Sequence, residues 1–368
     1  MHLEQLSCVH FRNLEKLEID LTSNTVVVCG KNGQGKTNLL EALYVCATGR
    51  SFRNAKPSEM LRFGTTGGRV RALVTRQGVR HSIEAELSEH RRTMRVDDRK
   101  LSHMSSLLRL VNVVAFFPDD LRIAKGSPEN RRRFLDRAVA NYQPKLVDAS
   151  LAYGQAMRSR NSLLRANKNP DLMQIAAYDE QLVAHGEVIH RCREEGLAAM
   201  SRRAASQFDT IMPRLEPLTL LLESGVTESG DDFAASFREA LKRSFSRDRK
   251  NGRTTVGPHR ADLCMSIGER DARIFASQGQ QRAIVLALKL AEVICLRDEL
   301  GIAPILLLDD VSSELDAERT DMLFGALAKV GSQLLVSTTG AVELPLPEET
   351  QILEVEAGVV REKPKARC

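Results

Sequence analysis

The segment GKNGQGKT, residues 30–37, constrains the fold of this chain more than any other stretch. It follows a short apolar run, TVVVC, and precedes NLLEALYVCAT, in which apolar residues recur at helical spacing. A strand, a glycine-rich loop and a helix form the context in which the pattern GxxxxGK[S/T] binds phosphate. The alternative, a glycine-rich turn without a ligand, fits this context much less well. The segment therefore predicts an α/β nucleotide-binding fold.

The chemistry of the loop assigns a role to each residue type. Glycines let backbone N–H groups surround phosphate oxygens, and the start of the following helix adds partial positive charge. We expect Lys36 to reach the β- and γ-phosphates and Thr37 to ligate Mg²⁺. The residues expected to contact ATP are Gly30, Lys31, Asn32, Gly33, Gln34, Gly35, Lys36, Thr37 and Asn38.

A second motif, which is acidic, lies in the C-terminal part of the chain. There the apolar run ILLL ends in Asp309 and Asp310. Carboxylates at the C-terminal end of a buried strand face the crevice in which such sheets bind ligands. We expect Asp309 to hold Mg²⁺ through water and Asp310 to orient or deprotonate the attacking water. The alternative is that both residues merely begin a loop, and the phosphate loop in the same chain weakens it.

The order of sequence patterns indicates a head interrupted by a helical insertion. Strand-like stretches occupy residues 3–28 and 69–97, and RLVNVVAFFP predicts another buried strand. Residues 128–250 carry long amphipathic helical patterns, strand character returns at 262–275, and a helix is expected over 278–299. The buried runs ILLLDD and QLLVSTT follow, with a helix expected between them over 317–329. We therefore expect strands from both ends of the chain to share one mostly parallel sheet.

Composition restricts the setting of the protein. The 368 residues suggest about two domains, and seven scattered cysteines without a CxxC pair are typical of reduced thiols. No stretch approaches 18 consecutive apolar residues and no signal peptide is evident, so we expect a cytoplasmic protein without a membrane partner. The net charge of +5 permits a nucleic-acid partner without requiring one.

The segment ASQGQQR, residues 276–282, admits two interpretations. Ser277 and Gln280 have the spacing of a capping box at a helix start. A hydroxyl, a glycine N–H and a helix dipole are also what a γ-phosphate requires, and the segment stands about one long helix before Asp309. The two interpretations are compatible, since a capping serine already presents its hydroxyl at the helix N-terminus.

Several motifs together resemble one family. They are FRN (11–13), the phosphate loop, PDDLRIAKGSPENRRRFLD (118–136), GPHRADL (257–263), SQGQQR (277–282) and LLLDDVSSELD (306–316). In this order along nearly the whole chain they resemble the RecF family of bacterial DNA repair and replication ATPases, which is related to the SMC proteins. The resemblance implies an ABC-type ATPase head with an inserted helical lever arm. We expect residues 1–137 and 251–368 to form the head and residues 138–250 to form the arm.

The resemblance also implies a function and its partners. ATP is expected between two heads, with Lys36 and Thr37 of one copy facing the signature segment of the other, Ser277, Gln278, Gly279 and Gln280. The D-loop at the interface would be Ser313, Glu314, Leu315 and Asp316. ATP-induced dimerisation would control binding to gapped, junction or single-stranded DNA. The protein would act with RecR and RecO, support RecA loading and serve the SOS response.

Two departures from the wider ABC pattern predict a slow, DNA-stimulated ATPase that works as a switch. The general base is Asp310, one methylene shorter than the usual glutamate. STT (337–339) replaces the switch histidine, so Thr338 or Thr339 would contact the γ-phosphate. Residues 116–120, FFPDD, occupy the region in which ABC ATPases carry the Q-loop.

A basic stretch at 237–260 is the candidate DNA contact, because phosphate neutralisation supplies most non-specific affinity. A solvated helix face is an equally good explanation of this charge run. The candidate residues are Lys242, Arg243, Arg247, Arg249 and Lys250. Arg131–Arg133 are weaker candidates that fit a structural role, and His259 is interpreted as fixing a loop.

Two other functions use a phosphate loop. The energy-coupling subunit of a transporter usually has its signature segment, LSGGQ, much nearer the phosphate loop than the roughly 240 residues found here. A small-molecule kinase would need a substrate pocket and no dimer site.

Overall fold

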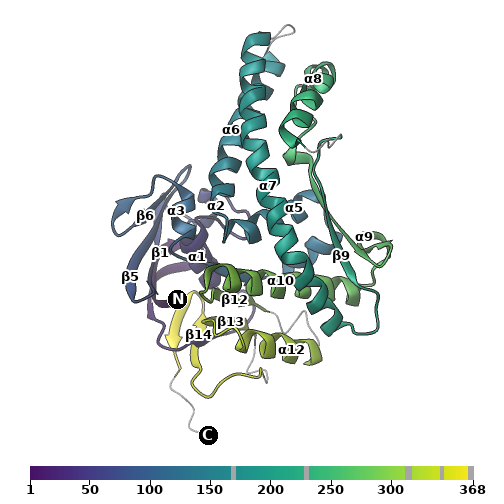
Figure 1. Cartoon of the computed structure of the whole chain (residues 1–368). Helices are drawn as coiled ribbons and strands as arrows, with labels where there is room; N and C mark the ends of the chain where they lie inside the picture. The colour runs from purple at the N-terminus through teal and green to yellow at the C-terminus, as the bar shows by residue number, and fades with distance from the viewer. Residues whose placement is uncertain (167–170, 228–231, 311–316, 340–343, 364–368) are drawn as a thin grey trace. The chain divides into compact units, whose positions relative to one another are not determined.

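The computed structural model describes residues 1–166, 171–227, 232–310, 317–339 and 344–363. Contacts between Cα atoms divide the chain into two compact units. We call residues 1–120 with 288–368 the head unit, and residues 121–287 the helical unit. The helical unit includes the predicted arm, 138–250, and extends beyond it at both ends. The chain colours of Figure 1 show that the head unit draws on both ends of the sequence.

One sheet of the head unit is built from both ends of the chain, as the sequence predicted. Its order is β15-β14-β3-β13-β12-β8, and neighbouring strands are parallel except at the antiparallel edge strand β15. Side chains of the central strands are buried, which explains their continuous apolar runs. The strands are β3 (Thr25–Cys29), β8 (Val113–Phe116), β12 (Ile305–Asp309), β13 (Leu334–Thr338), β14 (Gln351–Glu356) and β15 (Val359–Glu362).

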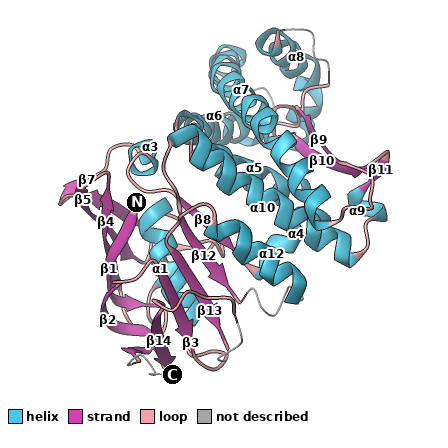
Figure 2. Cartoon of the chain, turned by 60° about the horizontal axis from the view of Figure 1, so that its bottom comes forward, coloured by secondary structure: helices cyan, strands magenta, loops and turns pink. Residues whose placement is uncertain are grey.

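A second sheet of the head unit is antiparallel, with the order β2-β1-β4-β5-β6-β7. Gly78 turns between β4 and β5 with a φ of 80°, a conformation that favours glycine. The first long helix, α1 (Lys36–Thr48), contacts strands of both sheets, and Figure 2 shows it among them. The strands are β1 (His2–Phe11), β2 (Leu14–Asp20), β4 (Gly67–Arg76), β5 (Val79–Ser88), β6 (Arg92–Val96) and β7 (Arg99–Lys100).

Shorter helices complete the head unit. They are α2 (Pro57–Met60), α3 (Met104–Leu108), η1 (Pro118–Asp120) and α12 (Ala317–Ala328). The long helix α10 (Gln278–Leu300) crosses the division between the units at residue 287. None of the helices in the described ranges combines the length and apolarity that crossing a bilayer requires.

The helical unit is built around α7 (Leu172–Ile211), a helix of 40 residues. Helices α6 (Lys145–Ala166) and α8 (Phe233–Asn251) lie beside it (Figure 1). Gly186 of α7 lies against the ring of Phe237 from α8, where a Cβ atom would come within 2.8 Å of the ring. A glycine inside the helix therefore allows close packing at this point.

Two elements of this unit differ from the sequence prediction. Residues 218–223, inside the stretch predicted to be helical, form strand β9 (Leu218–Glu223), which pairs with β10 (Asp262–Ile267). The alternating burial of its side chains is typical of a half-exposed strand. In the sequence this short alternation lies between long helical patterns, which dominate the prediction. Residues 272–275, expected to be strand-like, form α9 (Ala272–Phe275), capped by the carboxylate of Asp271. The remaining elements are α4 (Leu121–Lys125), α5 (Pro128–Ala140), η2 (Pro258–Arg260) and β11 (Arg270–Asp271).

Buried arginine pairs hold the motifs of the helical unit together. Arg131 forms two hydrogen bonds of 2.7 Å with the carboxylate of Asp262, which joins α5 to β10. Arg193 of α7 makes a similar two-point contact with Asp136 and also donates to the carbonyl oxygen of Pro258. The segments RRRFLD and GPHRADL are thus connected through their charged side chains.

Candidate functional site

The phosphate loop lies between β3 and α1, as the motif requires. Gly35 has a φ of 119°, and a Cβ atom there would come within 2.7 Å of the Asn13 side-chain amide. The Lys36 ammonium is buried and donates to the carbonyl oxygens of Gly30 (2.7 Å) and Lys31 (3.0 Å). Lys36 therefore crosses the loop that would hold the phosphates.

Residues from three elements line one cavity of about 180 Å³. The loop and α1 supply one wall, the end of β12 supplies Asp309 and Asp310, and β13 supplies Ser337. The lining residues are Asn32, Gly33, Gly35, Lys36, Thr37, Asn38, Arg53, Asp309, Asp310 and Ser337. All of them belong to the head unit. Most of the predicted ATP and magnesium residues thus meet in this cavity.

A cluster of short hydrogen bonds connects the acidic strand end to the loop. The hydroxyls of Thr37 and Ser337 both donate to Oδ1 of Asp309, at 2.9 and 2.6 Å. Burial raises the pKa of the Asp309 carboxyl, and these two hydrogen bonds oppose the rise. Asp310 adopts a left-handed φ of 49°, and its backbone N–H donates to the Ser337 hydroxyl at 3.0 Å. Ser337 therefore holds both aspartates.

The donor set of this cluster fits Mg²⁺. This ion prefers oxygen ligands, keeps several waters and usually takes only one or two protein carboxylates together with phosphate oxygens. Thr37 would supply a hydroxyl oxygen and Asp309 a carboxylate oxygen. These two atoms, Oγ1 and Oδ1, lie 2.9 Å apart. Within the described ranges, no group of three or more His, Cys, Asp or Glu side chains is placed to hold a metal ion. The proposed magnesium site needs only one carboxylate, because phosphate oxygens and water would complete the coordination.

The FRN motif braces the phosphate loop. The side-chain amide of Asn13 donates to the carbonyl oxygen of Gln34 at 2.8 Å and accepts a hydrogen bond from Asn38 at 2.8 Å. Ala357 and Gly358, which follow β14, donate backbone N–H groups to the side chain and the carbonyl oxygen of Gln34. The loop is thus held from both ends of the chain.

A buried ion cluster holds α1 behind the loop. Glu41, which is fully buried, accepts two hydrogen bonds from Arg12, at 2.8 and 2.9 Å. Arg53 lies 3.2 Å from the same carboxylate and also donates to Asn38 at 2.8 Å. The sequence patterns predict no role for Glu41, Arg53 or Ser337. Arg12 has a sequence signal, because it belongs to the FRN motif of the family pattern.

The signature segment starts α10 with the predicted capping box. The Ser277 N–H donates to Oε1 of Gln280 at 2.8 Å, and the Gln280 N–H donates to the Ser277 hydroxyl at 3.3 Å. Ser277 and Gln278 are exposed, and Gly279 is half-buried. The capping interpretation is confirmed, and the segment remains accessible for a ligand. The predicted D-loop residues Ser313, Glu314, Leu315 and Asp316 lie outside the described residues.

The two switch threonines occupy different positions. Thr338 is buried within β13, and Thr339 is exposed directly after the strand. Because side chains alternate along a strand, Ser337 and Thr338 point to opposite faces. Of the three residues of STT, it is Ser337 that lines the cavity.

The FFPDD segment is held by the buried Lys289 of α10. The Lys289 ammonium donates to the carbonyl oxygen of Ala115 at 2.7 Å and lies 3.5 Å from the carboxylate of Asp120. Asp120 in turn accepts a hydrogen bond from the N–H of Phe117 at 2.9 Å. The FFPDD segment is therefore fixed at its start and at its end.

The predicted DNA residues all lie exposed on α8. Arg243 pairs with Glu239 at 3.1 Å, and Nε of Arg247 donates to the Thr255 hydroxyl at 3.0 Å. Lys242, Arg249 and Lys250 make no salt bridge within the part of the chain that the structure describes. Arg131, by contrast, is buried against Asp262, which agrees with the structural role considered for it.

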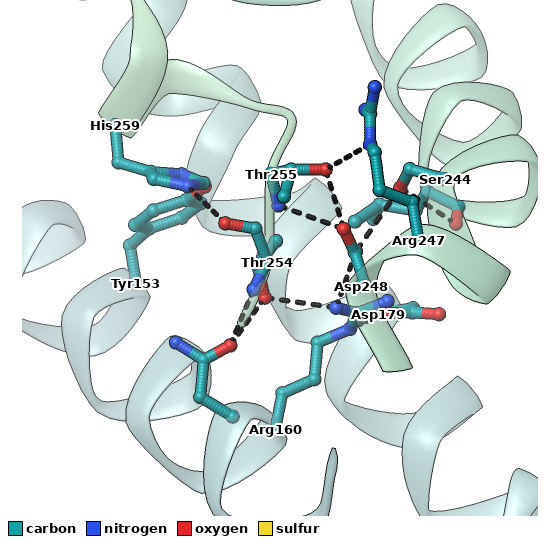
Figure 3. A network of polar contacts seen from close by, with 11 residues as sticks. Tyr153, Arg160, Asp179, Ser244, Arg247, Asp248, Thr254, Thr255 and His259 are labelled. Carbon is teal, nitrogen blue, oxygen red and sulfur yellow. Dashed lines mark hydrogen bonds and ion pairs between the residues drawn. The ribbon is translucent and has the colours of Figure 1, made fainter. Parts of the chain in front are cut away.

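His259 fixes a loop, in keeping with its sequence interpretation. Its Nδ1 lies 2.7 Å from the Tyr153 hydroxyl and its Nε2 lies 3.1 Å from the carbonyl oxygen of Thr254. Burial lowers the pKa of the ring to about 4. Figure 3 shows this pair beside a network around Arg160 and Asp248.

Comparison with known proteins gives consistent results over the whole chain. The family model described as the RecF/RecN/SMC N-terminal domain matches residues 2–345. The DNA replication and repair protein RecF of Myxococcus xanthus (strain DK1622) is 40% identical over 98% of this chain and 97% of its own. The protein of that name from Clostridium novyi (strain NT) is 32% identical over 98% of this chain and all of its own.

Solved structures agree with this assignment. The recombination mediator protein RecF-ATP of the RecFOR pathway superposes with a TM-score of 0.89 at 30% identity, covering 99% of this chain and 98% of that one. An SMC head bound to the winged-helix domain of ScpA gives a TM-score of 0.57 at 16% identity, which shows a shared fold. The fold is therefore that of an ABC-type ATPase head, and the chain belongs to the RecF family of SMC-like ATPases.

Proposed function

We propose that this protein is an ATP-controlled DNA-binding ATPase of recombinational repair and replication. The observation that carries the proposal is the convergence of Lys36, Thr37 and Asp309 in one cavity of the head unit. Lys36 would neutralise the β- and γ-phosphates, and Thr37 with Asp309 would hold Mg²⁺. Bound Mg²⁺ would neutralise charge that develops on the phosphates. Family membership, together with the position of the signature segment, disfavours the transporter and kinase alternatives.

ATP would close a dimer of two copies. The exposed hydroxyl of Ser277 and the N-terminus of α10 form a donor set suited to a γ-phosphate of the partner copy. The D-loop, residues 313–316, would cross the same interface, and Thr338 or Thr339 would respond to the γ-phosphate. Asp310, held by Ser337, would orient the attacking water. Its short side chain predicts slow hydrolysis, stimulated by DNA, in which ATP acts as a switch.

The dimer would bind gapped, junction or single-stranded DNA in the cytoplasm. Exposed cations on α8, including Lys242, Arg249 and Lys250, would neutralise backbone phosphates. Residues 138–250 would act as the lever arm that presents this helix. The name of the RecF-ATP relative places that protein in the RecFOR pathway, so we propose RecR and RecO as partners here. Support of RecA loading and of the SOS response follows from the same proposal.

Two variants test the dimer site. Lys36→Arg and Ser277→Arg should each abolish ATP-induced dimerisation in sedimentation velocity experiments. Ser277→Arg should leave ATP binding by the monomer within about twofold of the wild type, because Ser277 is not among the described residues that line the cavity. Loss of ATP binding by the Ser277→Arg monomer would contradict a role for Ser277 in the partner's site.

A further inference from the structure

A second cavity, of about 270 Å³, lies in the helical unit on one face of α8. Ser236, Ala240, Arg243, Ser244 and Arg247 recur along that face at helical spacing, and Thr227 with Val256 supply the opposite wall. Among the residues that the structure describes, the lining contains two guanidinium groups and three hydroxyls and no carboxylate. We call this cavity the α8 groove. Its chemistry selects an anionic ligand.

One arginine of the groove is held in place with its donors available. The Thr255 hydroxyl accepts from Nε of Arg247 at 3.0 Å and donates to the carboxylate of Asp248 at 2.6 Å. The two terminal nitrogens of Arg247 make no hydrogen bond to the described residues. Figure 3 shows them directed away from the network. Arg247 is therefore oriented by one contact and free to donate two more hydrogen bonds to a ligand.

The carboxylate of Asp248, which follows Arg247 in α8, is paired inside the unit. Asp248 is fully buried and pairs with Arg160 at 2.9 Å, and it also accepts hydrogen bonds from the N–H and the hydroxyl of Thr255. Arg160 is in turn paired with Asp179. Arg160 shares its single positive charge between the two carboxylates, so the charge of Asp248 is partly compensated inside the unit. Among the described lining residues, Arg243 and Arg247 supply the charge of the groove, and Arg243 also pairs with the exposed Glu239 at the surface.

We propose that the α8 groove receives a backbone phosphate of DNA, seated between Arg243 and Arg247. Guanidinium groups match the geometry of phosphate oxygens, and serine and threonine hydroxyls are common phosphate donors. The apolar lining residues, Ala240 and Val256, are small and leave little surface for the side chains of an acidic peptide. Arg249 and Lys250, which form no salt bridge with the described residues, do not line the groove and extend the positive charge along the same helix. This inference rests on the proposed DNA binding. It assigns direct phosphate contact to Arg243 and Arg247, and only long-range attraction to Arg249 and Lys250.

The test compares two variants of equal charge change in the full-length protein with ATP and a fluorescent gapped DNA. Arg243→Ala/Arg247→Ala should weaken binding at least tenfold and reduce the slope of log affinity against log salt by about 0.7–0.9, since one phosphate is no longer neutralised. Arg249→Ala/Lys250→Ala should weaken binding only a few-fold. Ala240→Leu, which fills the groove without changing charge, should reproduce the loss seen with the groove arginines. ATP binding and the circular dichroism spectrum should stay unchanged in all variants, which excludes misfolding.

The outcomes separate this inference from the function on which it depends. Equal losses in the two double variants, with no effect of Ala240→Leu, would overturn the groove and leave DNA binding intact. A wild-type protein that fails to bind DNA with ATP would overturn both. A polyglutamate peptide that displaced the DNA as well as an unlabelled oligonucleotide of equal charge would overturn the assignment to phosphate.

Discussion

At the scale of single residues, His259 shows how burial converts a titratable side chain into a structural one. Both ring nitrogens are within hydrogen-bonding distance of partners, Tyr153 and the carbonyl oxygen of Thr254. The ring is largely enclosed, and burial lowers its pKa to about 4, because water no longer stabilises the charged form. His259 is therefore neutral wherever the protein is folded near neutral pH.

This pKa shift makes folding stability depend on pH. The unfolded histidine titrates near 6.5, so the unfolded state binds more protons than the folded state between pH 6.5 and about 4. The contribution to the free energy of unfolding is complete above pH 6.5 and falls by up to about 3 kcal/mol as the pH drops to 4.

Urea unfolding of the wild type and of His259→Gln at pH 7 and pH 4.5 measures this contribution. The wild type should lose more stability than the variant over that range. Burial raises the pKa of Asp179, so this residue makes the free energy of unfolding rise as the pH falls. The wild type and the variant both contain Asp179, so its effect cancels in the comparison. Equal pH dependence of the two proteins would contradict the assignment to His259.

At the scale of elements, α1 is held by one buried carboxylate. Glu41 joins this helix to Arg12 at the end of β1 and to Arg53 in the following loop, and it accepts a short hydrogen bond from Ser51. Because α1 begins with Lys36 and Thr37, the same cluster sets the direction of the phosphate loop. The charge cluster thus fixes the orientation of α1 more specifically than apolar contacts alone would.

Replacing Glu41 with glutamine should destabilise the head unit strongly. The change leaves Arg12 and Arg53 without their shared counter-charge, and breaking a buried pair typically costs about 3–5 kcal/mol. The control is Glu86→Gln, which removes the exposed partner of Arg95 and should cost less than about 1 kcal/mol. Thermal unfolding of both variants provides the measurement, and similar shifts would contradict the clamping role of Glu41.

The elements that the sequence predicted correctly are those specified by local pattern. The phosphate loop, the apolar strand before Asp309 and the cap of α10 depend on residues a few positions apart, so their signals are visible in one window. The Arg12–Glu41 and Thr37–Asp309 contacts depend on chain segments 29 and 272 residues apart. Such pairing is set by the topology, which is why Glu41 and Ser337 could not be recognised from spacing. Strand β9 was missed because its partner, β10, comes 39 residues after its end.

At the scale of the whole molecule, the division into two units separates the two halves of the proposed ATP site. The lining of the nucleotide cavity belongs to the head unit, and the signature serine belongs to the helical unit. We therefore expect a single copy to bind ATP through the residues of its head unit, and the proposed contact of Ser277 with a γ-phosphate is a separate step that involves a second copy.

Hydrogen exchange should resolve these two steps. ATP added to dilute protein should slow exchange in residues 30–38, since ligand binding stabilises the segments it contacts. At concentrations that favour dimers, residues 277–281 should become protected as well. The Ser277→Arg variant should retain the first effect and lose the second. Protection of residues 277–281 in a protein that stays monomeric would contradict a site shared between copies.

The order of strands in the parallel sheet has a consequence for how the chain is made. Strand β3, which leads into the phosphate loop, is flanked on both sides by strands from the end of the sequence, β13 and β14. At 5–20 residues per second, synthesis of the roughly 300 residues between β3 and β13 takes about 15–60 s, during which β3 has neither neighbour. The helical unit is continuous in sequence, so all its segments emerge together and earlier. The proposed nucleotide site is therefore among the last parts of the nascent chain to form, and the apolar β3 segment waits for both of its neighbouring strands throughout that interval.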